Sequence, residues 1–189
     1  NNKDQLQDQL DKFKFNDKEM AKQMDRMLEL FKELELEKKM KESIDKLDKL
    51  AEEQKKLSKE TEQGKKENKE LEKKQDELSK KFDDLKKDIK DIEKKNEELA
   101  KPQEMEKTDK EQKEIEKEMK ESQENLEKQQ NSKAGQNQKK AAEKMKELGE
   151  KMESAMKKNK EKKHVEDYNT LREILENLVQ VSKDQEGLM

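Results

Sequence analysis

The chain has 189 residues, of which 51% are Asp, Glu, Lys or Arg and only 26% are hydrophobic. Ordinary globular domains are roughly half apolar and about one quarter charged, so this composition excludes a thick, rounded core and leaves either disorder or long, thin helices. The 47 basic and 50 acidic residues are finely interleaved, which argues against the basic face of a nucleic-acid-binding protein.

The first predicted element covers residues 1–16 and is a short N-terminal helix or lead-in. Leu6, Leu10 and Phe13 follow helical spacing, and the stretch "FKFND" then interrupts the period. We expect this segment to be a short extra helix that can fold onto the base of the structure.

A long outgoing helix is predicted over residues 17–100. Its apolar residues recur in alternating steps of three and four, the spacing that keeps a seam facing a partner helix. The seam is clearest from Met20 to Leu34 and from Leu71 to Leu99, and it is weakest around Gly64. Many acids precede a lysine by four residues, which further stabilises a helix.

The single proline, Pro102, predicts a turn at residues 101–103, because its ring disfavours helix at the preceding residue and removes a backbone donor. Beyond it we expect four segments in chain order. They are a first return helix at 104–128, a polar loop containing a glycine at 129–138, a second return helix at 139–186, and a tail at 187–189.

The two arms match about this turn. Residues equally distant from residue 101 would lie opposite each other, so that Leu57 falls near Met145 and Phe31 near Leu171. Strong seam then lies against strong seam, and the weak region around Gly64 lies against the predicted loop. We therefore predict an all-α fold, a long antiparallel coiled-coil helical hairpin with a broken return arm.

Residues that carry protein chemistry are scarce. Cysteine is absent, and the one histidine, His164, lies in the lysine-rich run 157–164. The many acids are matched with lysines on exposed faces, which gives no reason for a raised carboxyl pKa. We expect no enzyme, no catalytic residue, no metal and no cofactor. No apolar run approaches the roughly 18 residues of a membrane helix, so we expect no membrane span in this segment.

The segment 165–181 is the strongest candidate for contact with a partner protein. Its apolar face is wider than a two-helix seam needs. The candidate contact residues are Tyr168, Ile174, Val179 and Val181. The alternative is that the N-terminal helix of the same chain covers this face.

Three stretches resemble a known family: "MDRMLELFKELELEKKM" (24–40), "LDKLAEEQKKLSKET" (47–61) and "LREILENLVQVSKDQEGLM" (171–189). They resemble the coiled-coil region of large, uncharacterised, membrane-anchored Bacteroidota proteins that contain domain of unknown function 4175. The resemblance implies a periplasmic location in the cell envelope, within a longer protein anchored in the membrane. It implies no activity and assigns no functional residue.

The expected function is therefore structural. We predict a coiled coil that serves as a spacer or docking arm in a larger cell-envelope protein, with protein partners and no nucleic acid. One alternative is a chaperone-like module that clamps client polypeptides between apolar helical tips. Another is a parallel homodimeric coiled coil or a single charged helix, in which the chain would not fold back.

Overall fold

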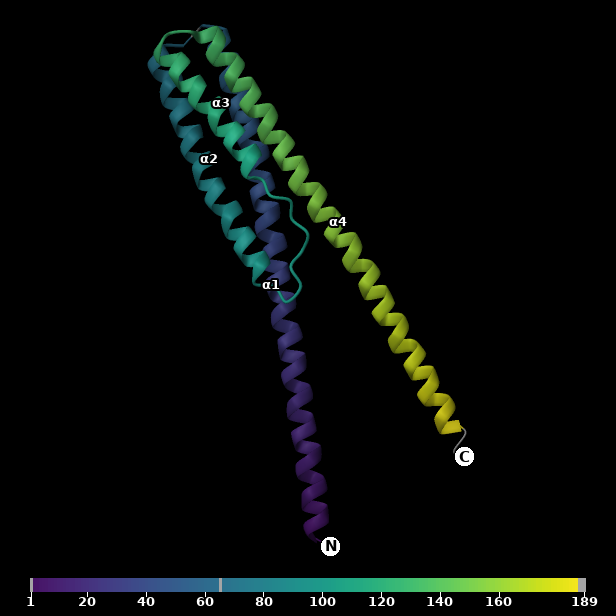
Figure 1. Ribbon diagram of the computed structural model, residues 1–189. Coiled ribbons are helices and arrows are strands. Elements are labelled where there is room, and N and C mark those ends of the chain that lie inside the picture. The colour runs from purple at the N-terminus through teal and green to yellow at the C-terminus, as the bar shows by residue number, and fades with distance from the viewer. Residues whose placement is uncertain (1, 65, 187–189) are drawn as a thin grey trace.

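The computed structural model describes the backbone of residues 2–64 and 66–186, and the side chains of residues 21–22, 24–64 and 66–163. The described backbone contains four helices and no strand: α1 (Asn2–Glu62), α2 (Asn68–Glu97), α3 (Asp109–Glu127) and α4 (Asn131–Glu186) (Figure 1). The all-α class predicted from the sequence is confirmed.

The helices form an antiparallel bundle. α1 packs on α2 and α4, and α3 packs on the same two helices (Figure 1). The direction of each pair follows from its ion pairs. On α1 and α2, Glu53 pairs with Lys81 and, further back along α1, Lys39 pairs with Asp91, each at 2.6 Å. On α3 and α4, Glu111 pairs with Lys151 at 2.7 Å, and further along α3 Glu118 accepts a hydrogen bond from Asn137, which lies further back along α4. Successive helices run up, down, up and down, as in a four-helix bundle (Figure 1).

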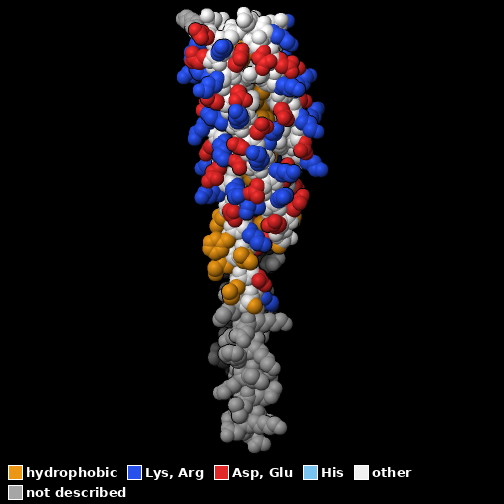
Figure 2. All heavy atoms as spheres, turned by 90° about the vertical axis from the view of Figure 1, so that its left-hand side faces the viewer, with side chains coloured by type: hydrophobic (Ala, Val, Ile, Leu, Met, Phe, Trp, Pro, Cys, Tyr) orange, Lys and Arg blue, Asp and Glu red, His pale blue; other side chains and the backbone are white. Residues whose placement is uncertain are grey.

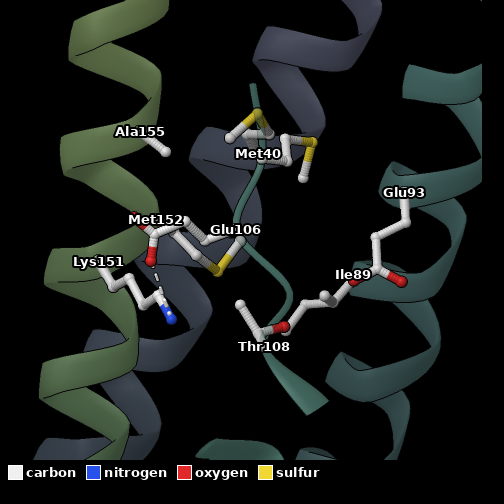
Figure 3. A pocket seen from close by; sticks show the side chains of 9 residues that line it. Met40, Ile89, Glu93, Glu106, Thr108, Lys151, Met152 and Ala155 are labelled. Atoms are coloured by element: carbon white, nitrogen blue, oxygen red, sulfur yellow. Dashed lines mark ion pairs between the residues drawn. The ribbon is translucent and has the colours of Figure 1, made fainter. Parts of the chain in front are cut away.

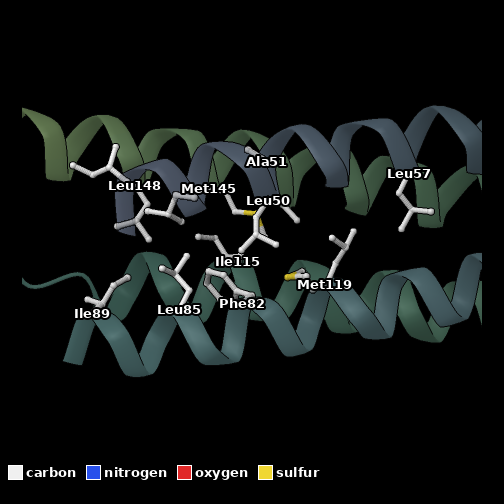
Figure 4. Packing of buried hydrophobic residues seen from close by; sticks show 14 of the residues in the cluster. Leu50, Ala51, Leu57, Phe82, Leu85, Ile89, Ile115, Met119, Met145 and Leu148 are labelled. Carbon is white, nitrogen blue, oxygen red and sulfur yellow. The ribbon is translucent and has the colours of Figure 1, made fainter. Parts of the chain in front are cut away.

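The bundle core follows the apolar spacing of each helix. On α2 every residue of the seam predicted from Leu71 onward is buried. These residues are Leu71, Gln75, Leu78, Phe82, Leu85, Ile89, Ile92 and Asn96. Figure 4 shows Phe82 from α2, Ile115 from α3, Leu50 from α1 and Met145 from α4 directed toward one another. Each large apolar side chain buried in this way contributes roughly 1.5–3 kcal/mol before conformational entropy is subtracted.

The prediction of a single hairpin is wrong, because the outgoing helix 17–100 is two helices. α1 starts at Asn2, without a break near residue 16, and it ends at Glu62. The chain then turns at Gly64, whose φ of 60° lies in the left-handed region that glycine adopts at little cost. This turn lets four helices enclose one core, whereas a hairpin would bury only one stripe on each helix.

The predicted loop at 129–138 is also wrong, because α4 begins at Asn131. α3 ends in a Schellman cap: the Gln129 N–H donates to the Leu126 carbonyl at 2.9 Å and the Gln130 N–H to the Asn125 carbonyl at 2.8 Å. The chain reverses within these residues. This reversal and the turn at Gly64 lie at the same end of the bundle (Figure 1).

The two turns give a paired prediction about backbone strain. Gln129 has a φ of 57° without being a glycine, so Gln129→Gly should raise the free energy of unfolding by about 0.5–1 kcal/mol. Gly64→Ala should lower it by a similar amount, because a Cβ at this φ is strained although nothing lies within 4 Å of it. Urea unfolding checks both signs, and a shared sign would contradict this reading of the turns.

Pro102 lies in a longer connection than the predicted turn at 101–103. α2 ends at Glu97, and residues 98–108 cross to the start of α3 without forming a helix. Asn96 holds this segment, since its amide both donates to the Gln103 carbonyl and accepts from the Gln103 N–H, each at 2.8 Å. Leu99 is buried against α1, so the connection is part of the packed structure.

A layer of polar side chains crosses the middle of the core. Gln75 on α2 accepts hydrogen bonds from the Gln54 amide of α1 at 2.8 Å and from the Ser122 hydroxyl of α3 at 3.0 Å. Gln138 on α4 is equally buried, but neither its amide nitrogen nor its amide oxygen has a partner among the described groups. Three helices thus share a hydrogen-bond network, and the fourth contributes an unpaired amide.

Candidate functional site

One end of the molecule is open, because α1 and α4 are longer than the helices between them. The last turns of α2 lie level with Glu35, which pairs with Lys95 at 3.0 Å. Upstream of this level α1 continues without α2, and α4 likewise continues past the bundle, so two helical arms point in the same direction (Figure 1).

The exposed apolar side chains lie on the α1 arm. Six large hydrophobic residues there are between 47% and 65% exposed, and we call them the α1 stripe: Met24, Met27, Leu28, Leu30, Phe31 and Leu34. Figure 2 shows them as an apolar patch directly below a bundle surface covered by mixed charges. Among the side chains that the structure describes, these are the large exposed hydrophobic ones.

The stripe is exposed because the apolar pattern changes phase between Leu34 and Leu36. Leu36 and Met40 are buried in the bundle and belong to the core face of α1. Continuing that face backward in steps of three and four reaches Glu33 and Glu29, which are charged and half-buried. At about 100° per residue, the stripe lies on nearly the opposite side of the helix from this core face.

The inner face of the α1 arm is acidic, and its carboxylates have partners in the rest of the chain. Glu29 accepts a hydrogen bond from the Ala100 N–H of the crossing segment at 2.5 Å. Glu33 pairs with Lys163 of α4 at 2.5 Å, and Glu37 pairs with Lys160. These contacts fix the rotation of α1 about its axis and leave the apolar stripe facing outward.

This arrangement corrects the predicted contact between the two arms. The sequence predicted that Phe31 would face Leu171, yet Phe31 is 62% exposed and points away from the core face of α1. The four candidate contact residues belong to α4, but the structure does not describe their side chains. They are Tyr168, Ile174, Val179 and Val181. The stripe is thus a second candidate surface, and the step of two residues between Leu34 and Leu36 was its signal in the sequence.

One hollow of the bundle has no room for a small molecule. This hollow lies beside the crossing segment, where Met40, Ile89 and Met152 surround about 10 Å³ (Figure 3). That is about the space of one water molecule, whereas ligand pockets usually measure 300–1,000 Å³. At its rim Lys151 pairs with Glu106 at 3.1 Å and with Glu111 at 2.7 Å, and hydrogen bonding to Lys151 lowers the pKa of Glu111.

Neither a metal cluster nor a membrane helix is found in the described part of the chain. No group of three or more His, Cys, Asp or Glu residues there could hold a metal ion. No helix within the same residues is long and apolar enough to cross a bilayer.

One acid on the wall of the hollow has an altered titration. Burial, together with the negative charges of Asp109 and Glu97, raises the pKa of the Glu93 carboxyl above its ordinary value. The folded state therefore binds this proton more tightly than the unfolded chain does. The stability linked to Glu93 is complete at low pH and is lost as the pH rises through its raised pKa.

Glu93→Gln should consequently stabilise the protein at pH 7. The expected gain is about 0.2–0.5 kcal/mol, the size of one like-charge pair on a helix, and it should disappear near pH 3, where Glu93 is protonated. Urea unfolding at both pH values checks this, with the exposed Glu77→Gln as control. A gain of equal size at both pH values would contradict the assigned cause.

Comparison with known proteins adds no family to these observations. No family model, no curated protein and no solved structure matches this chain. The fold and the α1 stripe define an all-helical bundle with an exposed apolar face on one arm. The resemblance to the Bacteroidota family stays a prediction.

Proposed function

We propose that this chain is a structural interaction module, a four-helix bundle that serves as a spacer and carries a docking arm. The observation that carries the proposal is the α1 stripe, six large apolar side chains exposed on a helix that the rest of the chain holds in one rotation. Exposed apolar patches of this kind mark sites of protein contact.

The dimensions suit a spacer. At 1.5 Å per residue, α1 and α4 are each roughly 85–90 Å long, and about half of that length extends beyond the bundle. Ion pairs between neighbouring helices, such as Lys46 with Asp88 at 2.6 Å and Lys86 with Glu116 at 3.1 Å, run along the bundle and support a single register. In line with the family resemblance, we place this module in a larger, membrane-anchored protein on the periplasmic side of the cell envelope.

The two alternatives fit these observations less well. A clamp would present apolar residues at both tips, yet the tip formed by the turns exposes Gln63, Gly64, Gln129 and Gln130. A parallel homodimer or a lone helix would need its seam to be filled by another chain or left open. In this fold the seams of α1, α2, α3 and α4 fill one another within the chain.

Site-specific photocrosslinking in the native host tests the docking arm. A photoreactive amino acid at Leu30, on the stripe, should give discrete crosslinked products. The same amino acid at Lys73, an exposed residue of α2 within the bundle, should give none. If Leu30 produced no product above the level at Lys73, the proposed function would be overturned.

A further inference from the structure

We propose that the α1 stripe binds the α1 stripe of a second copy of this chain, with the two helices antiparallel about a twofold axis. The inference deepens the proposed function and rests on it, because it names the partner of the same docking surface. Four observations carry it: the symmetry of the stripe, its width, its lack of charge and the position of α4.

The stripe is symmetric in sequence about Glu29. Under reversal about this residue, Met24 exchanges with Leu34, Met27 with Phe31, and Leu28 with Leu30. A twofold interface brings the same patch of each copy onto itself, so its contact positions must have this reversal symmetry when the two helices are antiparallel. When the twofold axis passes next to Glu29 of both copies, each large apolar residue of one stripe therefore lies at the same height along the helix as a large apolar residue of the other stripe.

The stripe is wider than the seam of a two-helix contact. Its six members span an arc of about 160° at 100° per residue, because Leu28 and Leu30 flank the 3-4 spaced residues on both sides. The flanking residues would seal the edges of a helix packed on the stripe. Met24 and Phe31 share one position around the helix, Met27 and Leu34 share another, and Leu28 and Leu30 add two more. A helix that faced solvent would not need four neighbouring apolar positions, so this width indicates that another molecule covers the face.

The charged residues of this stretch stay outside the proposed contact. Asp25, Arg26, Glu29, Lys32 and Glu33 all fall between the stripe positions and lie on the other side of the helix. Pairing two stripes therefore desolvates apolar surface without burying an unpaired charge, which would be costly.

The α4 helix of the same chain is not placed to cover the stripe. Lys160 and Lys163 of α4 pair with Glu37 and Glu33, on the inner face of α1. Covering the stripe from within would require α1 to rotate by nearly half a turn and to break both ion pairs and the Glu29 contact with Ala100. A separate chain can reach the stripe with these contacts intact.

The interface is small, so the dimer should be weak. Stable interfaces bury about 800 Å² on each partner, which is more than six half-exposed side chains provide. We expect a dimer that forms at micromolar concentrations and dissociates on dilution.

Sedimentation of the full chain over a concentration series tests the association. The mass should rise from 22.6 kDa toward twice that value. Met27→Glu combined with Phe31→Glu places four acids in the interface and should weaken association more than about 100-fold. The control, Gln63→Glu with Gln136→Glu, makes the same charge change at exposed positions near the turns and should leave association unchanged. A monomer at all concentrations, or equal weakening by both variants, would overturn the proposal.

Cysteine crosslinking tests the orientation in a chain that has no cysteine of its own. A mixture of Met24→Cys and Leu34→Cys chains should form a disulfide between the two variants under mild oxidation. Each variant alone should not, because Met24 and its counterpart lie about 15 Å apart along the axis, too far for a disulfide. Efficient disulfide formation within one variant would indicate parallel helices and overturn the antiparallel arrangement.

The two proposals fail in different ways. A monomer in solution that still crosslinks through Leu30 to another protein in cells would overturn the second copy and leave the docking arm standing. Absence of both self-association and cellular crosslinks would overturn the inference together with the proposed function.

Discussion

Phe82→Ala should lower the free energy of unfolding by about 3–5 kcal/mol, the usual loss for a buried Phe replaced by Ala. Phe82 is 1% exposed and is the largest fully buried side chain of the bundle. Its ring lies in the layer between α1, α3 and α4 (Figure 4), and Lys86 lies 5.9 Å from the ring centre on the outer side. Removal of the ring leaves a cavity between several helices. These helices pack against one another and cannot move inward to fill it.

The chain offers a matched control for this experiment. Phe31→Ala makes the same chemical change at a residue that is 62% exposed, and it should alter stability by less than about 0.5 kcal/mol. Denaturant unfolding should be measured at concentrations where the chain is monomeric, so that self-association does not contribute. Similar losses for the two variants would mean that Phe82 is not in a packed core.

The same substitution at two glutamines should have opposite effects. Gln75→Met should destabilise the bundle by about 2–4 kcal/mol, because Gln54 and Ser122 would each lose their buried partner. Gln138→Met should stabilise it by about 1–2 kcal/mol, because this change replaces two unpaired buried polar atoms with an apolar group of similar shape.

The contrast isolates hydrogen bonding from side-chain volume, since both changes are Gln to Met in the same core. Thermal and denaturant unfolding of the two variants provide the comparison. Changes of the same sign would show that the polar layer is not organised around Gln75. We infer that the polar layer fixes the register of the helices, because a shift of one helix along another would leave buried polar groups without partners.

Periodicity predicted which side chains are buried in the bundle. The seam expected on α2 is the buried set. On α3 the buried residues Ile115, Met119, Ser122 and Leu126 follow the same spacing. The prediction succeeded because each helix directs one face to the core, and residues on one face of a helix recur every three or four positions.

The number of helices was not predictable in the same way. A seam shows that a helix has a partner, but a seam residue packs similarly in a hairpin and in a bundle. One glycine, Gly64, decides between them, and an isolated glycine is a weak signal. The polar run before Ala141 predicts a loop for a related reason. Asn137 and Gln138 are buried polar residues of α4, although residues of this kind are typical of a turn.

The candidate surface was only partly visible in the sequence. The spacing from Met24 to Leu34 predicts a seam, and the step of two residues to Leu36 is the one sign that this seam and the core face have different phases. The structure shows that this phase change turns the residues outward, which makes them a surface instead of a core. Whether such a stripe faces inward depends on contacts such as Glu33 with Lys163, which join residues far apart in the chain.

The four-helix fold requires the chain to turn at Gly64, and one distance between α1 and α2 shows whether it does. Spin labels attached at cysteines introduced in place of Glu53 on α1 and Lys81 on α2 can be measured by pulsed electron resonance. The two side chains form an ion pair of 2.6 Å in the bundle, so we predict a distribution centred below about 20 Å, allowing for the length of the labels. A continuous helix would separate the sites by about 42 Å, and a distribution centred there would contradict the four-helix fold.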